Sequence, residues 1–323
     1  MLVDSYSRKF RYLRLSLTEK CNFKCGYCLP NGYRGCPAKS LDLREIANLA
    51  FAFKELGVEK IRLTGGEPTL RSDLSEIVQI LKSDVGIPQV ALTTNGFRLE
   101  QDMEELKRAG LDALNISLDS LRKDKFRSIC GADKCESVKR SVDRALRLDF
   151  KSVKLNCVLL KGLNDTEFSD FLEFAASRPI SIRFIELMRT GDNKEYFERH
   201  HLPVHSLEQR LLDSGWKPHP ATFISGPAKE FGHESSMGRI GFISPYSKDF
   251  CSTCNRLRVS STGGLRLCLF GQGDLPLRSL LQKSEDRFAL SDRIVSALKL
   301  KPEGHKLHEN VFGNMQSLSA IGG

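Results

Sequence analysis

The fold is decided by the stretch from Tyr12 to Cys28, which reads YLRLSLTEKCNFKCGYC. Its first part alternates apolar and polar residues, and this period of two predicts a strand over Tyr12 to Leu17. Cys21, Cys25 and Cys28 follow directly, with the spacing C-x3-C-x2-C. Three thiolates cannot close a four-ligand structural metal site on their own. Their spacing therefore indicates either a remote fourth ligand or a metal position that is left for an exchangeable group.

The same plan of strand, polar loop and helix repeats to about residue 190. Five more strands are predicted, at Lys60 to Thr64, Gln89 to Thr94, Ala113 to Leu118, Ser152 to Leu159 and Ile180 to Ile185. Helices are predicted between them, at Asp42 to Leu56, Ser72 to Lys82, Asp102 to Ala109, Glu136 to Leu148 and Thr166 to Ala176. Asp42 and Glu45 form the pattern of a capping box. Strands that alternate with helices pair in parallel, so the fold class is α/β, either a doubly wound sheet or an incomplete barrel.

The six strands have one apolar face and one polar face, whereas a fully buried parallel strand is normally apolar on both. The polar face carries five cations, Arg14, Lys60, Arg62, Lys154 and Arg183. If helices cover the apolar face, the polar face must line a lumen. Buried cations need anions beside them. An antiparallel sheet with its polar face in water is the alternative, and the intervening helices argue against it.

The composition describes a folded globular protein. Hydrophobic residues make up 40% and charged residues 28% of the chain, which excludes disorder, collagen and coiled coil as descriptions of the whole. Lys and Arg (49) exceed Asp and Glu (40) by 9, which favours an anionic partner without requiring nucleic acid. No apolar run suits a membrane helix or a secretory signal, so we expect a cytoplasmic protein. Ten cysteines in such a chain indicate metal or redox chemistry rather than disulfides.

The regular pattern ends near residue 190, and a second domain is expected. We predict a barrel domain at 1–218 and an α+β region at 219–323. The second region holds a further triplet, Cys251, Cys254 and Cys268, spaced C-x2-C-x13-C. Leu275 to Leu300 is predicted to form one or two helices, followed by a polar tail that ends in Gly322 and Gly323.

The first triplet resembles the signature of radical S-adenosylmethionine enzymes. In that family the three thiolates hold three irons of a 4Fe-4S cluster, and S-adenosylmethionine chelates the fourth. Gly65 to Pro68, which follows the second predicted strand, resembles the family motif for the amino group of S-adenosylmethionine. Thr93 to Gly96 and Ser117 to Asp119 close the next two strands, so every candidate contact lies at one end of the barrel. The resemblance implies an incomplete (βα)6 parallel barrel, followed by a region that carries a second cluster.

The second triplet narrows the resemblance to the GTP 3',8-cyclase family of molybdenum cofactor biosynthesis. Phe250 to Arg258, Leu265 to Phe270, Arg183 to Met188 and the final Gly-Gly all fit that family, almost end to end. The resemblance implies a second 4Fe-4S cluster on Cys251, Cys254 and Cys268, with GTP beside it. It also implies conversion of GTP to 3',8-cyclo-7,8-dihydro-GTP, with the glycine tail entering the pocket.

The family contacts carry over to individual positions of this chain. Four match contacts to S-adenosylmethionine: Tyr27, Gly66, Ser117 and Met188. Seven match contacts to GTP: Arg14, Arg62, Thr93, Lys154, Arg256, Leu257 and Arg258. No amino acid is assigned as a catalytic residue. Arg189 stands where many relatives have Pro. The cysteines outside the triplets are expected to be packing residues: Cys36, Cys130, Cys135 and Cys157.

The resemblance also implies partners. These are a flavodoxin or ferredoxin-type electron donor and the next enzyme of the molybdopterin pathway, with no nucleic acid and with a homodimer left open. Two other functions stay open. One is a radical S-adenosylmethionine enzyme that acts on a peptide. The other is a zinc-stabilised nucleotide or RNA-binding protein, suggested by the net charge of +9 and the C-x2-C pair.

Overall fold

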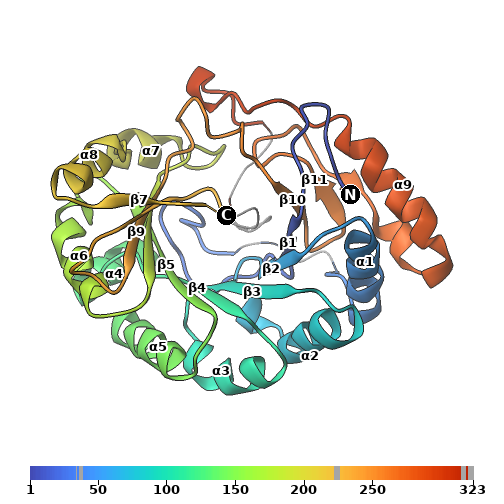
Figure 1. Ribbon diagram of the computed structural model, residues 1–323, viewed down its shortest axis with the longest axis horizontal. Helices are drawn as coiled ribbons and strands as arrows, with labels where there is room; N and C mark the ends of the chain where they lie inside the picture. Colours follow the sequence, from blue (N-terminus) through green and yellow to red (C-terminus); the bar gives the residue numbers. More distant parts are fainter. Residues whose placement is uncertain (34, 36–38, 222–225, 314–317, 319–323) are drawn as a thin grey trace.

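The computed structural model describes residues 1–33, 35, 39–221, 226–313 and 318. Figure 1 shows strands in the interior, with helices outside them. The strands are β1 (Tyr12–Ser16), β2 (Lys60–Thr64), β3 (Gln89–Thr94), β4 (Ala113–Ser117), β5 (Ser152–Leu159), β6 (Ser181–Glu186), β7 (Lys217–His219), β8 (Lys229–Gly232), β9 (Arg239–Ile243), β10 (Arg256–Val259), β11 (Gly264–Arg266) and β12 (Leu275–Pro276). The helices are α1 (Leu43–Glu55), α2 (Leu74–Gln79), α3 (Leu99–Arg108), α4 (Lys123–Cys130), α5 (Cys135–Arg147), α6 (Phe168–Ala176), α7 (Lys194–His200), α8 (His205–Asp213) and α9 (Arg287–Leu298).

Among the described residues, these strands form one sheet in the order β12-β11-β10-β1-β2-β3-β4-β5-β6-β9-β8-β7. Strands β1 to β6 are the six that the sequence predicts, and each pairs in parallel with the next. Helices α1, α2, α3, α5 and α6 lie outside the arc of strands (Figure 1). The end strands β12 and β7 are not neighbours, so the barrel stays open. The expected α/β partial barrel is confirmed.

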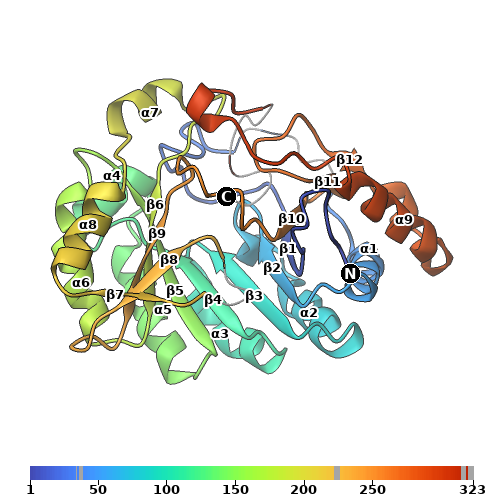
Figure 2. The same cartoon turned by 45° about the horizontal axis from the view of Figure 1, so that its top comes forward.

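The second half of the chain extends the barrel wall at both ends. Strand β10 lies parallel to β1, and β9 lies parallel to β6, while β7, β8, β11 and β12 add antiparallel edges (Figure 2). These short strands pair with partners far away in the sequence, so local pattern alone could not reveal them. The boundary expected after residue 218 falls within β7 (Lys217–His219) and stays a prediction.

The alternation within the strands separates the core from the lumen. Leu13, Leu15, Ile61 and Leu63 are fully buried in the main apolar core. Arg14 lies between Leu13 and Leu15 and therefore projects to the opposite face. The two-faced character predicted from the sequence thus produces a barrel wall with an apolar outside, covered by helices, and a polar inside.

The helices differ from the sequence prediction in four places, two of which are the unpredicted helices α7 and α8. Helix α4 was not predicted, and the second predicted helix continues from α2 into a π-helical turn at Ile80–Asp84. Leu275 to Leu300 contains the α-helix α9, within the one or two helices predicted, and Leu275–Pro276 at its start pairs with β11. None of the helices in the described part of the chain is long and apolar enough to cross a membrane.

Asp42 forms the predicted capping box at the start of α1. Its side chain accepts a hydrogen bond from the Glu45 backbone N–H at 2.9 Å, and the Glu45 carboxylate accepts one from the Asp42 N–H at 2.9 Å. We expect Asp42→Ala to lower the free energy of unfolding of the apo chain by about 1 kcal/mol in urea titrations. Asp42→Ser keeps a capping oxygen and should lose much less. Equal losses for the two variants would contradict a capping role.

Candidate functional site

Two cavities lie inside the barrel and share a wall. The first, termed the Cys21 cavity, has an empty volume of about 980 Å³ and is lined by the first cysteine triplet and by the ends of β2, β3 and β4. The second, termed the Cys254 cavity, has an empty volume of about 930 Å³ and is lined by the second triplet and by arginines. Asn156, Ile185 and Met188 line both cavities. Ligands in the two cavities would therefore be neighbours.

The loop of the first triplet is fixed by the end of α4. The Lys24 N–H donates to the Cys130 carbonyl at 3.0 Å, and the Gly26 N–H donates to the Ile129 carbonyl at 3.1 Å. A turn follows, in which the Leu29 N–H donates to the Cys25 carbonyl at 2.9 Å. The helix that the sequence pattern missed therefore supplies the backbone acceptors that hold the loop of Cys25 in place.

Gly65 and Gly66 are required where the end of β2 passes the same loop. A Cβ atom on Gly66 would lie 2.2 Å from the Lys20 carbonyl oxygen, and one on Gly65, whose φ is +149°, would lie 2.5 Å from that of Thr18. The Gly66 N–H donates to the Thr18 carbonyl at 2.7 Å. The resemblance assigns these glycines to a motif for the amino group of S-adenosylmethionine. They line the Cys21 cavity, but the close approach seen here is to the protein backbone.

The buried carboxylate of Glu67 ties the ends of β2 and β3 together. It accepts hydrogen bonds from the Thr94 hydroxyl at 2.7 Å and from the Asn95 N–H at 2.7 Å, as well as from Thr69. Burial raises its pKa against these hydrogen bonds. The Asn95 amide in turn lies 3.9 Å from the Cys21 sulfur. Glu67 therefore positions the strand ends beside the first triplet, a role that the Gly-Gly-Glu-Pro motif alone does not reveal.

Asp119 performs a similar task on the other side of the Cys21 cavity. It accepts hydrogen bonds from the Tyr27 hydroxyl at 2.8 Å and from the Val158 N–H at 2.8 Å, and burial raises its pKa. The Cys130 thiol lies 3.6 Å from the same carboxylate and lines the cavity. We expected Cys130 to be a packing residue only, and its contacts place it next to Cys25 as well. Cys36 lies outside the described residues.

The spacing of the thiols distinguishes a cluster from a single ion. A tetrahedral zinc site with Zn–S bonds of about 2.3 Å brings its sulfur ligands to about 3.8 Å from one another. Within the part of the chain that the structure describes, the one group of three ligand atoms that all lie within 4.8 Å of one another is Cys25, Asp119 and Cys130. Both triplets are more open than this, so three thiolates around a larger iron-sulfur cluster fit better than a single zinc ion.

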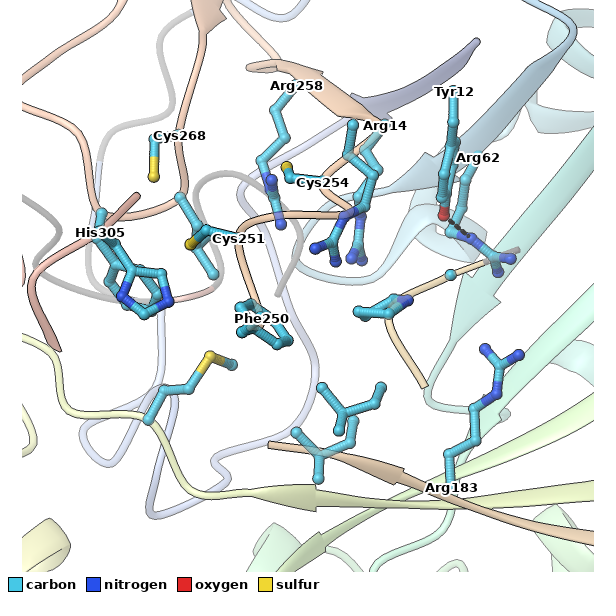
Figure 3. A pocket seen from close by; sticks show the side chains of 18 of the residues that line it. Tyr12, Arg14, Arg62, Arg183, Phe250, Cys251, Cys254, Arg258, Cys268 and His305 are labelled. Atoms are coloured by element: carbon cyan, nitrogen blue, oxygen red, sulfur yellow. Dashed lines mark hydrogen bonds between the residues drawn. The ribbon is translucent and has the colours of Figure 1, made fainter. Parts of the chain in front are cut away.

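Arginines from three neighbouring strands form a row along the Cys254 cavity. Arg14 on β1 is in register with Arg62 on β2 and with Arg258 on β10. Figure 3 shows Arg14 and Arg258 close to the second triplet, and Arg62 and Arg183 further from it. Arg62 donates to the Tyr12 hydroxyl and to the Thr93 hydroxyl. Positive charge therefore extends from the thiols at one end of this cavity to Arg62 and Arg183 at the other, as suits an anionic ligand.

Mutual repulsion and burial shift the pKa values of the titratable side chains on the inner face of the barrel, which is termed the cationic wall. Burial, with Arg183 beside it, lowers the pKa of Lys154 to about 7, and burial with Arg62 beside it lowers that of Lys60 to about 8. Burial raises the pKa of Tyr12, but Arg62, Arg14 and Lys60 outweigh it and bring the value down to about 7. The wall therefore disfavours further positive charge and favours bound negative charge.

The second triplet is also surrounded by positively charged side chains. Burial raises the pKa of Cys254, but Arg256 and Lys301 outweigh it and lower the value to about 7, which favours a thiolate. The Cys251 carbonyl accepts a hydrogen bond from Arg8 at 3.0 Å, and Arg8 is held by Asp4 at 2.7 Å. Arg8 and Lys301 were not singled out from the sequence, because they lie far from the cysteines along the chain.

Most of the predicted site residues come together at these cavities. The Cys21 cavity is lined by Cys21, Cys25, Cys28, Tyr27, Gly66, Thr93, Ser117 and Met188. The Cys254 cavity is lined by Arg14, Arg62, Met188, Cys251, Cys254, Arg256, Arg258 and Cys268. Lys154 and Leu257 are not among the lining residues: Lys154 approaches Glu230, and Leu257 is buried in the apolar core. The tail residues Gly322 and Gly323 lie outside the described residues, although Leu318 lines the Cys21 cavity.

Gly66→Ala tests the close packing of the first triplet loop. The added methyl group would collide with the Lys20 carbonyl, so we expect a loss of about 1 to 3 kcal/mol in the free energy of unfolding of the apo chain. Gly232→Ala is the matched control, because a Cβ atom there has no neighbour within 4 Å. Urea titrations of both variants would measure the difference. A Gly66→Ala chain as stable as the Gly232→Ala chain would refute the steric constraint.

Comparison with known proteins identifies the family. The chain matches the family model described as "Radical SAM superfamily" over residues 15–175 and that described as "Molybdenum Cofactor Synthesis C" over residues 180–307. It is 51% identical to a GTP 3',8-cyclase of Stenotrophomonas maltophilia, covering 100% of this chain and 99% of the relative. It is 48% identical to a GTP 3',8-cyclase of Haemophilus influenzae, covering 100% of this chain and 96% of the relative.

The fold also has solved counterparts. The structure of Streptococcus suis SuiB bound to S-adenosylmethionine aligns with a TM-score of 0.64 at 14% identity, covering 90% of this chain and 68% of that one. At this level of identity the likeness concerns the fold. The identity to the cyclases over the whole length, together with both family models, is decisive. The chain belongs to the GTP 3',8-cyclase family of radical S-adenosylmethionine enzymes.

Proposed function

We propose that this chain converts GTP to 3',8-cyclo-7,8-dihydro-GTP in molybdenum cofactor biosynthesis. The observation that carries the proposal is the pair of adjoining cavities. Each is lined by a cysteine triplet that is more open than a zinc site, and only the Cys254 cavity is rich in arginine. Full-length identity of 45 to 51% to cyclases supports the same reaction. Two 4Fe-4S clusters and S-adenosylmethionine are the cofactors of this family, and the thiols described above fit the two clusters.

The two ligands divide between the two cavities. Cys21, Cys25 and Cys28 would hold the first cluster, and Tyr27, Gly66, Ser117 and Met188 would contact S-adenosylmethionine. The first cluster would supply the electron for reductive cleavage of S-adenosylmethionine, and S-adenosylmethionine would supply the radical chemistry that acts on C3' of GTP. The chain itself has to hold the two ligands in a near-attack geometry and to exclude water. The shared wall of Asn156, Ile185 and Met188 suits that task.

GTP would occupy the Cys254 cavity, with Cys251, Cys254 and Cys268 holding the second cluster beside it. Arg14, Arg62, Arg256 and Arg258 would bind the triphosphate, because each guanidinium donates paired hydrogen bonds and stays charged. Thr93 would act from the neighbouring cavity, next to Arg62. Lys154 would act from behind the lining residues. Since the side chain of Leu257 is in the core, its contact with GTP would come from the backbone.

The reaction also requires partners. A low-potential, one-electron donor of the flavodoxin or ferredoxin type would reduce the first cluster, and the next enzyme of the molybdopterin pathway would take the product. We further propose that the chain works in the cytoplasm and without nucleic acid, and a homodimer remains open. The peptide-modifying alternative has no use for a buried row of arginines, and the open triplets argue against the zinc-stabilised alternative.

The decisive experiment is anaerobic incubation of the reconstituted chain with GTP, S-adenosylmethionine and dithionite. Mass spectrometry should detect the cyclised nucleotide together with 5'-deoxyadenosine. Reactions without GTP, and reactions with ATP in its place, are the controls. Cleavage of S-adenosylmethionine without any cyclised nucleotide, from a chain with about eight irons, would exclude the proposed reaction.

The two triplets should have separable roles. Cys25→Ala should abolish formation of 5'-deoxyadenosine, because the radical-generating cluster loses a ligand. Cys254→Ala should leave part of that cleavage while cyclisation is lost. Cys135→Ala is the control: this buried thiol contacts the Ser120 carbonyl, lines neither cavity and should be without effect. Both products are measured by chromatography. Loss of cleavage in Cys254→Ala with its first cluster intact by spectroscopy would contradict the division.

GTP binding should be coupled to proton uptake. At pH 8 the lowered pKa values of Lys154, about 7, and Lys60, about 8, leave both ammonium groups partly deprotonated. A bound triphosphate, itself fully ionised at this pH, favours the charged ammonium form and raises both values. We therefore expect net proton uptake at pH 8 and an affinity that falls as the pH rises from about 7 to 9. Calorimetry in buffers of different ionisation enthalpy measures the uptake.

Guanosine and one variant are the controls for this coupling. Guanosine has no phosphate, so its binding should exchange no protons with these lysines. Lys154→Met should reduce the uptake that accompanies GTP binding, while Lys299→Met, an exposed lysine at the end of α9, should leave it unchanged. Proton release on GTP binding, or uptake of equal size with guanosine, would show that the lysines do not sense the phosphates.

A further inference from the structure

The cationic wall contains one carboxylate that the family resemblance does not assign. Among the described residues that line the Cys254 cavity there is no Asp or Glu, although five arginines and one lysine line it. Behind this lining, Glu230 on β8 accepts hydrogen bonds from Arg183 Nη2 at 2.7 Å, Arg183 Nε at 3.1 Å and Ser181 Oγ at 2.9 Å. Lys154 Nζ lies 3.8 Å from the same oxygen atom. Glu230 therefore neutralises part of the wall.

The sheet is built so that this pair can form. Arg183 on β6 is in register with Gly241 on β9, and Gly241 is in register with Glu230 on β8. A Cβ atom on Gly241 would lie 3.3 Å from Arg183 Cγ and 3.3 Å from Glu230 Cγ. The glycine leaves the space in which the two side chains meet across the intervening strand. The contact is therefore a feature of the lumen face and not a chance meeting of surface side chains.

Glu230 remains ionised under all ordinary conditions. Burial raises its pKa, but Arg183 and Lys154 outweigh burial and lower the value to about 2. Only 15% of its side chain is exposed. A fixed negative charge in this position reduces the positive potential of the cavity, and the reduction acts on every phosphate that enters. A ligand with more phosphates loses more binding free energy to it, and a ligand without phosphate loses none.

We propose that Glu230 is a specificity-determining residue that weakens the binding of polyphosphate in the Cys254 cavity. This inference rests on the proposed function, in which GTP occupies that cavity. The product keeps the triphosphate of the substrate, so a wall without an anion of its own would hold substrate and product alike too tightly. Binding that is equally strong for substrate and product adds nothing to turnover, and slow release of product limits turnover. Glu230 keeps the affinity of the wall low enough for product to leave.

The experiment compares Glu230→Gln with the unaltered chain, using GTP, GDP, GMP and guanosine as ligands under anaerobic conditions. The glutamine keeps the shape and an acceptor oxygen for Arg183 but lacks the charge. We expect it to bind GTP at least five-fold more tightly, with a smaller gain for GDP and GMP and none for guanosine. Release of the cyclised nucleotide, measured by a chase with excess GTP, should be slower. The gain in affinity should shrink at high salt.

Two further variants keep the test specific. Glu230→Asp retains the charge and should leave the ratio of GTP to guanosine affinity close to that of the unaltered chain. Glu208→Gln removes a carboxylate on α8 that lies 4.0 Å from Lys229, outside both cavities, and should change nothing. If Glu230→Gln is folded by circular dichroism but binds GTP equally well or less well, the inference is overturned. If the unaltered chain does not bind GTP, the proposed function itself fails.

Discussion

The repulsion between buried cations is the constraint on which the site depends. Register places Arg62, Arg14 and Arg258 side by side on β2, β1 and β10, on the inner face of the barrel. Charges so close together in a poorly hydrated space destabilise the fold unless anions accompany them. Glu230 and the acidified hydroxyl of Tyr12 supply part of the compensation. A bound triphosphate would supply the rest, so the same charges that destabilise the apo chain would provide its affinity for the proposed substrate.

The period of two in each strand joins this site to the stability of the molecule. Leu13 and Leu15 pack in the core beneath the helices, and Arg14 between them faces the lumen. A strand that slipped by one residue would bury the arginine among helices and expose the leucines. The apolar core therefore fixes the register of β1, and the register fixes the arginine row. Affinity for an anion and folding of the barrel are in this way specified by the same residues.

Local patterns were sufficient for the parts of the fold and site that depend on neighbours in sequence. Strands β1 to β6, the capping box of Asp42 and both cysteine triplets could be predicted in this way. The pairing of β10 with β1 could not, because β10 is four residues long and its partner lies more than 200 residues away. The role of Glu230 could not be predicted for the same reason, because it contacts Arg183 across a glycine on an intervening strand. Helix α4 was not predicted because its eight residues are mostly charged or polar.

The non-local pairings also explain why the two cavities adjoin. Strand β10 brings Arg256 and Arg258, which follow Cys254 directly in the chain, to the edge of β1, and β1 leads directly into the first triplet at Cys21. Because the two strands are parallel, Cys254 precedes this strand pair and Cys21 follows it, so the two triplets lie at opposite ends of the pair with the lumen between them. Chemistry that begins on a ligand in one cavity would have to reach a ligand in the other across the side-chain wall that the two cavities share. Pairing of β10 with β1 therefore joins the two halves of the candidate site.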